Sequence, residues 1–171
     1  HNSQRQHMHA GMEVNVSDWR DWGLKSQIDA RILAYIGFKN SALFGFDPLK
    51  NERSFATPRS WEAVHKILQS PLPSNLLLEA ISGAVGEERA VDFLGFSKIM
   101  EYLPDIDAIL RGDEVDAPSE LSTLYALSNV LVSRILSDHS EEALSNVLRY
   151  TLKLKNEFAV LIVQDLQRQG V

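Results

Sequence analysis

The chain has 171 residues, a formal net charge of −6 and no cysteine. This length allows one sizeable hydrophobic core, and the lack of cysteine excludes disulfide bonds and thiolate chemistry. The acidic balance argues against direct nucleic-acid binding, which depends largely on Lys and Arg neutralising phosphates. No apolar run approaches the length of about 18 residues that a membrane-spanning helix needs. We therefore expect a cytoplasmic protein that contacts neither membrane nor nucleic acid.

The first predicted element is a strand. Apolar and polar residues alternate strictly from Met8 to Val16, which is the pattern of a half-buried strand, and no other stretch has it. A single strand cannot satisfy its own backbone hydrogen bonds. We therefore interpret residues 1–16 as the exit from a domain lying upstream, although residues 1–6 are equally compatible with an artificial leader.

Residues 17–171 have helical periodicity and predict an all-α bundle of about eight helices. Ser17 is expected to cap a short helix that ends near Gly23, and its Trp19 and Trp22 are interpreted as core residues. A longer helix that is apolar on several sides is expected at the centre of the bundle. The other helices are expected from about Gln27, over Pro58–Gln69, Asn75–Ala84, Glu87–Tyr102 and Asp105–Arg111, over the central Ser119–Ser137, from Ser140, and over Phe158–Leu166.

A long loop is expected between Gly37 and Ala56, and it leads directly into one of these helices. Loops of this length in compact domains are usually functional. Thr57 and Pro58 mark the start of the helix, because the threonine hydroxyl can cap an unpaired N–H and a proline at the first helical position needs no donor.

Arg59 projects from this helix on the side opposite the apolar stripe of Trp61, Val64 and Leu68. A cation in the first helical turn opposes the helix dipole, at a typical cost of about 0.3–1 kcal/mol. Two explanations remain open: Arg59 faces an anionic ligand, or it forms a surface ion pair with Glu62 three residues later.

Metal binding is not expected from the sequence. His7 and His9 would share one face of the predicted strand, but no third ligand lies near them in the sequence. The acidic linker around Asp113, Glu114 and Asp116 lacks the glycine and the spacing of a calcium loop, so we interpret it as a solvated turn.

No catalytic constellation is visible either. The chain contains no GxxxxGK[ST], GxGxxG or HExxH motif and no nucleophile elbow. We therefore do not expect this chain alone to be an enzyme.

The chain contains, in order, the four segments FATPRSWEAVHKIL, ISGAVGEERAVDFLGF, LPDIDAILRGD and LYALSNVLV. Together they resemble the C-terminal helical part of MoxR-like AAA+ ATPases of bacteria and phages. The resemblance extends from about Val14 to the end of the chain. It implies a lid-like helical domain over residues 17–171, with a C-terminal helical extension, and it places the orphan strand of residues 1–16 at the end of a nucleotide-binding sheet.

The TPR tripeptide resembles the sensor-2 motif of that family, whose arginine reaches from the lid to the nucleotide phosphates. The resemblance thus implies that Arg59 contacts ATP, with Thr57 and Pro58 positioning it. The phosphate-binding loop, the magnesium-binding acids and the arginine finger have no counterpart in this chain, so ATP and Mg would be held by an upstream AAA+ core domain. The implied partners are that core and further copies in a ring. Two alternatives remain: a free-standing helical interaction module without catalytic activity, or a small enzyme of unrecognised type.

Overall fold

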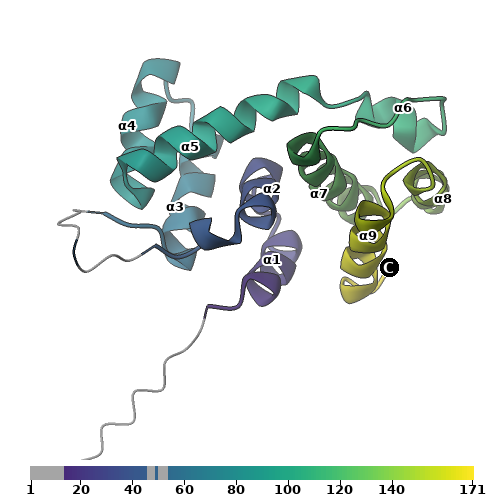
Figure 1. The fold of residues 1–171 in the computed structure, drawn as a ribbon, viewed down its shortest axis with the longest axis horizontal. Coiled ribbons are helices and arrows are strands. Elements are labelled where there is room, and N and C mark those ends of the chain that lie inside the picture. Colours follow the sequence, from purple (N-terminus) through teal and green to yellow (C-terminus); the bar gives the residue numbers. More distant parts are fainter. Residues whose placement is uncertain (1–13, 46–48, 50–53) are drawn as a thin grey trace, which may run out of the picture.

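The structure is a computed structural model that describes residues 14–45, 49 and 54–171. All regular elements within these residues are helical, which confirms the predicted all-α class (Figure 1). The described elements are α1 (Val16–Lys25), α2 (Ala30–Phe38), η1 (Asn40–Ala42), α3 (Pro58–Gln69), α4 (Ser74–Val85), α5 (Glu87–Ser97), η2 (Lys98–Tyr102), α6 (Ile106–Arg111), α7 (Leu121–Asp138), α8 (Glu141–Thr151) and α9 (Asn156–Arg168), of which η1 and η2 are 3₁₀ helices.

The helices form two groups that meet where α2 packs against α7. Helices α1 to α5 lie on one side of the molecule and α6 to α9 on the other, as Figure 1 shows. Helix α7 also packs against α8 and α9, and it buries nine of its 18 residues. The expectation of a central long helix is therefore confirmed.

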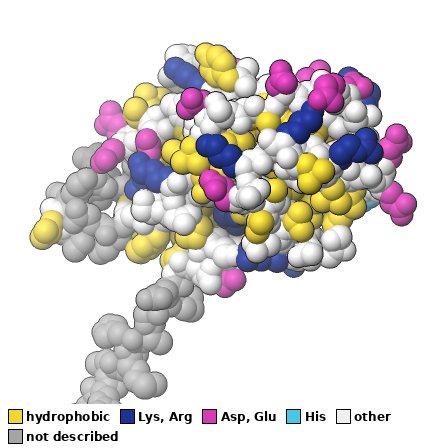
Figure 2. All heavy atoms as spheres, turned by 45° about the vertical axis from the view of Figure 1, so that its right-hand side comes forward, with side chains coloured by type: hydrophobic (Ala, Val, Ile, Leu, Met, Phe, Trp, Pro, Cys, Tyr) yellow, Lys and Arg dark blue, Asp and Glu magenta, His cyan; other side chains and the backbone are white. Residues whose placement is uncertain are grey.

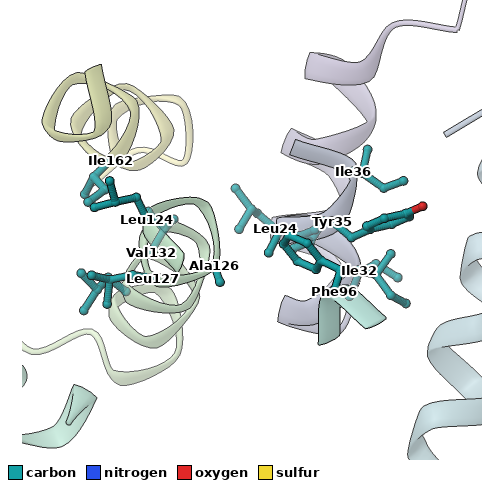
Figure 3. Close-up of a cluster of buried hydrophobic side chains, with 14 of the residues drawn as sticks. Leu24, Ile32, Tyr35, Ile36, Phe96, Leu124, Ala126, Leu127, Val132 and Ile162 are labelled. Carbon is teal, nitrogen blue, oxygen red and sulfur yellow. The ribbon is translucent and has the colours of Figure 1, made fainter. Parts of the chain in front are cut away.

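The hydrophobic core is continuous across both groups. Helix α7 contributes side chains to both sides, because Leu124 points toward Ile162 of α9 whereas Ala126 points toward the side of Leu24 and α2 (Figure 3). On α2, five consecutive residues from Ile32 to Ile36 are buried, so this short helix is surrounded by its neighbours.

The start of α1 corrects the predicted strand. The Asn15 side chain accepts a hydrogen bond from the Asp18 N–H at 3.1 Å, and Val16 is already helical. Asparagine is as good a helix cap as serine, so the helix begins two residues earlier than a cap at Ser17 would place it. Residues 8–13, which carry most of the alternating pattern, lie outside the described residues.

Gly23 does not end α1 as predicted. A Cβ atom at this position would lie 2.7 Å from Cδ2 of Leu33, so the missing side chain allows α1 and α2 to pack closely. The helix continues to Lys25, and Gln27, with a φ of 54°, turns the chain. The Asp29 side chain then caps α2 by accepting from the N–H of Arg31, so this helix begins later than predicted.

Other boundaries also differ from the prediction. Helix α4 extends to Val85 rather than Ala84, and the chain breaks before α5 at Gly86, whose φ is 88°. Helix α9 is longer than predicted, since it begins at Asn156 and ends at Arg168. The end of the predicted Glu87–Tyr102 helix is a 3₁₀ helix, η2. Glu120, rather than Ser119, directly precedes α7.

The surface is mixed in character. Figure 2 shows charged side chains of both signs interspersed with exposed hydrophobic ones on the visible face. Trp22 is 40% exposed, so its interpretation as a core residue is wrong, whereas Trp19 is partly buried against the core. Within the described ranges, no helix combines the length and the apolar composition required to cross a membrane.

Candidate functional site

The candidate site is built around the start of α3, where the predicted capping is observed. The Ser60 N–H donates to Oγ1 of Thr57 at 3.0 Å, and the Thr57 N–H donates to Oγ of Ser60 at 2.8 Å. These reciprocal bonds form a capping box, which satisfies two backbone donors at once. Pro58 occupies the first helical position, as predicted. The direction in which α3 leaves the preceding loop is therefore well fixed.

Arg59 is exposed at the second position of this helix. Trp61 and Val64, on the other side of α3, are fully buried, so the arginine projects away from the core as the periodicity predicted. Among the described residues Arg59 forms no ion pair or side-chain hydrogen bond, so the alternative of a surface pair with Glu62 is not observed. The guanidinium is therefore available to an external anion, and its contact with phosphate stays a prediction.

The buried side of α3 is anchored by Trp61. Its indole N–H donates to the carbonyl oxygen of Ala42 at 2.9 Å, across the loop that separates α2 from α3. Its ring lies 5.6 Å from the Tyr35 ring and 5.5 Å from the Phe93 ring, measured between centroids. Helix α3 is thus held simultaneously by η1, α2 and α5.

A second contact ties the middle of α3 to the start of α2. Nδ1 of His65 accepts a hydrogen bond from the Asp29 N–H at 3.0 Å. Burial opposes ionisation of Asp29, but hydrogen bonds from Arg31 outweigh this effect and lower the pKa of Asp29 below its usual value. Asp29, the residue that caps α2, is thus also hydrogen-bonded to the helix that carries Arg59.

The loop before α3 has a closed stem. The Gly45 N–H donates to the carbonyl oxygen of Ala56 at 3.0 Å, and the rings of Phe44 and Phe55 meet edge to face at 6.4 Å. The two ends of the loop therefore meet immediately before Thr57. The third phenylalanine of the predicted loop, Phe46, lies outside the described residues.

The corner between α4 and α5 supports this stem from the side. Oγ of Ser54 donates to the carbonyl oxygen of Ser82 at 3.0 Å. A Cβ atom on Gly86 would lie 3.0 Å from the carbonyl oxygen of Ser54, so this glycine is required both by its φ of 88° and by the close approach. Sequence reasoning did not identify this contact, because it joins residues far apart in the chain.

A polar network that the sequence did not predict lies beside the stem. The Tyr35 hydroxyl donates to Oδ2 of Asp92, and Nζ of Lys39 lies 2.7 Å from the same oxygen. Arg89 lies close enough to Tyr35 to favour a lower pKa of its hydroxyl, and Nη2 of Arg89 lies 3.3 Å from the position of a Cβ on Gly45. Helices α2 and α5 therefore place a tyrosine, a carboxylate and two cations near the base of the loop.

The network shifts the protonation of its members. Burial raises the pKa of Tyr35, and the hydrogen bond to Asp92 acts in the same direction. Partial burial opposes ionisation of Asp92, but hydrogen bonds from Lys39 and Tyr35 outweigh it and lower the pKa of Asp92. Because Asp92 is favoured as the anion in the folded state, its contribution to stability is lost as the pH falls through its folded-state pKa.

The linker after α6 is stabilised by ion pairs. Nη2 of Arg111 lies 2.9 Å from Oδ2 of Asp113, and Lys153 pairs with Glu114. In the part of the chain that the structure describes, no group of three or more His, Cys, Asp or Glu side chains is arranged to hold a metal ion. His7 and His9 lie outside these residues.

A second buried polar cluster, also missed by sequence reasoning, joins α1, α7 and α9. Nη2 of Arg20 donates to Oδ2 of Asp165 at 2.9 Å and to Oδ1 of Asn129 at 3.0 Å. Arg20, Asn129 and Asp165 are 8%, 1% and 2% exposed. Burial raises the pKa of Asp165, although the charge of Arg20 opposes this.

Comparison with known proteins identifies no relative of the chain. No protein-family profile, curated protein or solved structure matches the chain. The resemblance to MoxR-like lids therefore rests on the four sequence segments given above.

Proposed function

We propose that this chain is the nucleotide-sensing lid and C-terminal helical domain of a MoxR-like AAA+ ATPase. Arg59 then acts as a sensor-2-like arginine that contacts the ATP phosphates, with Thr57 and Pro58 fixing the start of its helix. ATP and its Mg would be bound by an upstream AAA+ core domain, and copies of the whole protein would assemble into a ring.

The observation that carries this proposal is the exposure of Arg59 at a well-fixed position, without a partner among the residues that the structure describes. Its helix is capped at the start and anchored by Trp61 and His65 on the buried side. The guanidinium has no ion pair among the described residues. A guanidinium can hold phosphate through two parallel hydrogen bonds, and a rigid support reduces the entropy lost when they form.

The test measures ATP turnover in the longer protein that joins this chain to the proposed core. We expect Arg59→Ala to lower turnover by about tenfold or more, equivalent to about 1.4 kcal/mol in the activation barrier. Arg59→Lys should also be damaging, because an ammonium group cannot reproduce the two-pronged contact. The reading frame upstream should encode a phosphate-binding loop and magnesium-binding acids.

Lys66→Ala is the matched control, because Lys66 is an exposed cation in the last turn of the same helix. Its turnover should equal that of the wild type. The unfolding temperature of the isolated chain should be the same for Arg59→Ala, Lys66→Ala and the unmodified sequence. Unchanged turnover in Arg59→Ala, or unfolding of the isolated variant, would defeat the sensor assignment.

One observation favours the alternative of a free-standing interaction module. Of the 12 residues of α4, only Ile81 and Val85 are buried, and Leu76 is 43% exposed. An apolar helix with so little cover is typical of surfaces that meet another protein. Normal turnover in Arg59→Ala, or an upstream frame without a phosphate-binding loop, would favour this second function.

A further inference from the structure

Two exposed surfaces of opposite charge lie at opposite ends of the molecule. The first, the α4 surface, consists of the exposed side chains of residues 70–88. The second, the α8 surface, consists of the exposed side chains of residues 143–155. Helices α4 and α8 lie toward opposite ends of the long axis in Figure 1, so the two surfaces can meet only between two copies of the chain.

The α4 surface is apolar and acidic. Its three charged residues are all acids, namely Glu79, Glu87 and Glu88. Leu72 is 39% exposed and Leu76 is 43% exposed. By their spacing, Leu76, Glu79 and Gly83 lie on the same side of α4, and all three are exposed. This side of the helix therefore presents a leucine beside a carboxylate.

Gly83 has no packing role among the described residues. A Cβ atom at this position would have no neighbour within 4 Å. A glycine within a helix makes the helix less stable than an alanine would, and its benefit is a close approach of the backbone to another group. Gly83 therefore fits a partner helix that approaches α4 closely.

The α8 surface is apolar and basic. Its three charged residues are all cations, namely Arg149, Lys153 and Lys155. Leu148 and Leu152 are one helical turn apart, and they are 39% and 84% exposed. Burial of a leucine as exposed as Leu152 against another apolar side chain is favourable. This surface thus has the same apolar character as the α4 surface and the opposite charge.

The charges determine which surfaces can pair. Glu79 and Arg149 form no ion pair with any residue that the structure describes. Contact between two α4 surfaces would bring carboxylates together, and contact between two α8 surfaces would bring cations together, so both are opposed by repulsion. Contact between an α4 surface and an α8 surface combines opposite charges with leucines on both sides.

The acids of α8 itself do not change this conclusion. Glu141 and Glu142 lie in the first turn of α8, and Arg149 lies in its last turn. At 1.5 Å per residue, the separation along the helix axis is about 10 Å, which is about one Debye length at 0.1 M salt. The second half of α8 therefore remains basic.

We propose that the α4 surface of one copy docks on the α8 surface of a second copy, with Glu79 facing Arg149 and Leu76 packed near Leu152. The two surfaces differ, so the contact is heterologous. Its repetition gives a closed ring or an open chain of copies, depending on the rotation between neighbours. The inference rests on the part of the proposed function in which copies assemble, and it requires neither ATP nor Arg59.

The test is sedimentation velocity of the chain over a range of concentrations. Two short helices bury less than the roughly 800 Å² per partner of a standard interface, so we expect weak association at about 0.1–1 mM protein. The average sedimentation coefficient should rise with protein concentration. Association should be weaker in about 1 M than in about 0.1 M sodium chloride, because the Debye length falls from about 10 Å to about 3 Å.

Charge reversal tests the pairing of the two surfaces. Glu79→Lys and Arg149→Glu should each weaken association by about tenfold or more. Both changes in one chain should restore the affinity to within about threefold of the original, because the two charges are again opposite. Lys25→Glu is the matched control, since Lys25, like Arg149, is an exposed cation in the last turn of its helix. It should associate as the unmodified chain does.

A pair of glycine variants tests the close approach at α4. Gly83 and Gly95 are both exposed within helices, and a Cβ at either position has no neighbour within 4 Å. Glutamine is a good helix former, so Gly83→Gln and Gly95→Gln should both fold, which their unfolding temperatures at low concentration measure. Only Gly83→Gln should weaken association, by about tenfold or more.

Three results would overturn the proposal. The first is the absence of concentration-dependent association up to about 1 mM. The second is a double variant that associates no better than Glu79→Lys alone, since the two charges would then not face each other. The third is unchanged or tighter association of Glu79→Lys, which would indicate contact between two α4 surfaces. None of these results bears on Arg59, because ATP turnover tests that assignment separately.

Discussion

Replacement of Arg20 by methionine tests whether the buried polar cluster determines the stability of the fold. The side chains of Arg20 and Asp165 are only 10% and 3% exposed, and the Nη2 to Oδ2 distance is 2.9 Å. Methionine keeps most of the apolar stem of the arginine but removes its charge. The variant therefore leaves Asp165 buried without its main cation, and it also removes a donor from Asn129.

The expected loss of unfolding free energy at neutral pH is about 3–5 kcal/mol, the range for breaking a buried ion pair by removing one partner. For a chain of this size, a change of 1 kcal/mol lowers the unfolding temperature by about 2–4 °C. The variant should therefore unfold about 6–20 °C below the wild type. Denaturant titration and thermal unfolding followed by circular dichroism measure both quantities.

The pKa of Asp165 determines how the loss of stability in Arg20→Met changes with pH. Burial raises the pKa of Asp165, and Arg20 acts against this shift, so removal of Arg20 raises the pKa further. A raised carboxyl pKa means that the folded state favours the protonated form. The loss in Arg20→Met should therefore be smallest below the unfolded-state pKa of about 3.9 and should grow as the pH rises through the folded-state pKa.

The double variant Arg20→Met with Asp165→Leu provides the control. Replacing both members of a buried ion pair by apolar residues is often close to neutral, so the double variant should recover most of the lost stability. A loss below about 1 kcal/mol in Arg20→Met would match a solvated surface pair and refute the reasoning. A double variant as unstable as the single one would refute it as well.

Two further predictions concern local backbone geometry. Gly112→Ala should lower the unfolding free energy by about 1–3 kcal/mol, because Gly112 has a φ of 83° that is unfavourable for alanine. A Cβ there would also lie 2.8 Å from Oδ1 of Asn146 and would disturb the hydrogen bond that the Asn146 amide donates to the carbonyl oxygen of Leu110 at 2.9 Å. Denaturant titration should show this loss, and a change within experimental error would mean that Asn146 moves freely. Thr57→Ala should cost about 0.5–2 kcal/mol by removing the acceptor for the Ser60 N–H, whereas Thr57→Ser should cost less. Equal stabilities of the two Thr57 variants would contradict this.

The start of α3 could be predicted because its causes are local. A threonine before a proline at the first helical position specifies both the cap and the first turn, and the observed helix begins and ends at the predicted residues. The predicted start of α8 at Ser140 is also observed, and the Ser140 hydroxyl caps the helix by accepting from the Ala143 N–H at 3.2 Å. A capping hydrogen bond joins residues only three positions apart, so the local sequence is sufficient to predict it.

Other features escaped prediction because their causes are long-range. Arg20 hydrogen-bonds to residues 109 and 145 positions away, and nothing in its local sequence distinguishes it from a solvated arginine. The local sequence predicts a helix end at Gly23, but the structure shows that the missing side chain instead allows Leu33 to approach closely. A glycine in a helical pattern has the same local signature in both roles, and only packing distinguishes them.

The candidate site shows the same division. Periodicity predicted the outward direction of Arg59, and the structure confirms that it lies opposite the buried Trp61. The support beside it, where Gly86 meets the carbonyl of Ser54, joins the α4 and α5 corner to the loop stem. The Asp92 network likewise depends on the packing of α2 against α5. Neither contact has a sequence signature.

The buried side of α3 explains why Arg59, rather than a core residue, is the informative position for testing function. A series of ring contacts with centroid distances of 5.3–5.9 Å crosses the molecule from α3 to α7. The series runs through Trp61, Tyr35, Phe96, Phe38 and Tyr125. A substitution of Trp61 would therefore alter packing in both groups of helices, and a loss of turnover would have two explanations. Arg59 lies outside this series, so a loss of turnover with unchanged unfolding can be assigned to its guanidinium.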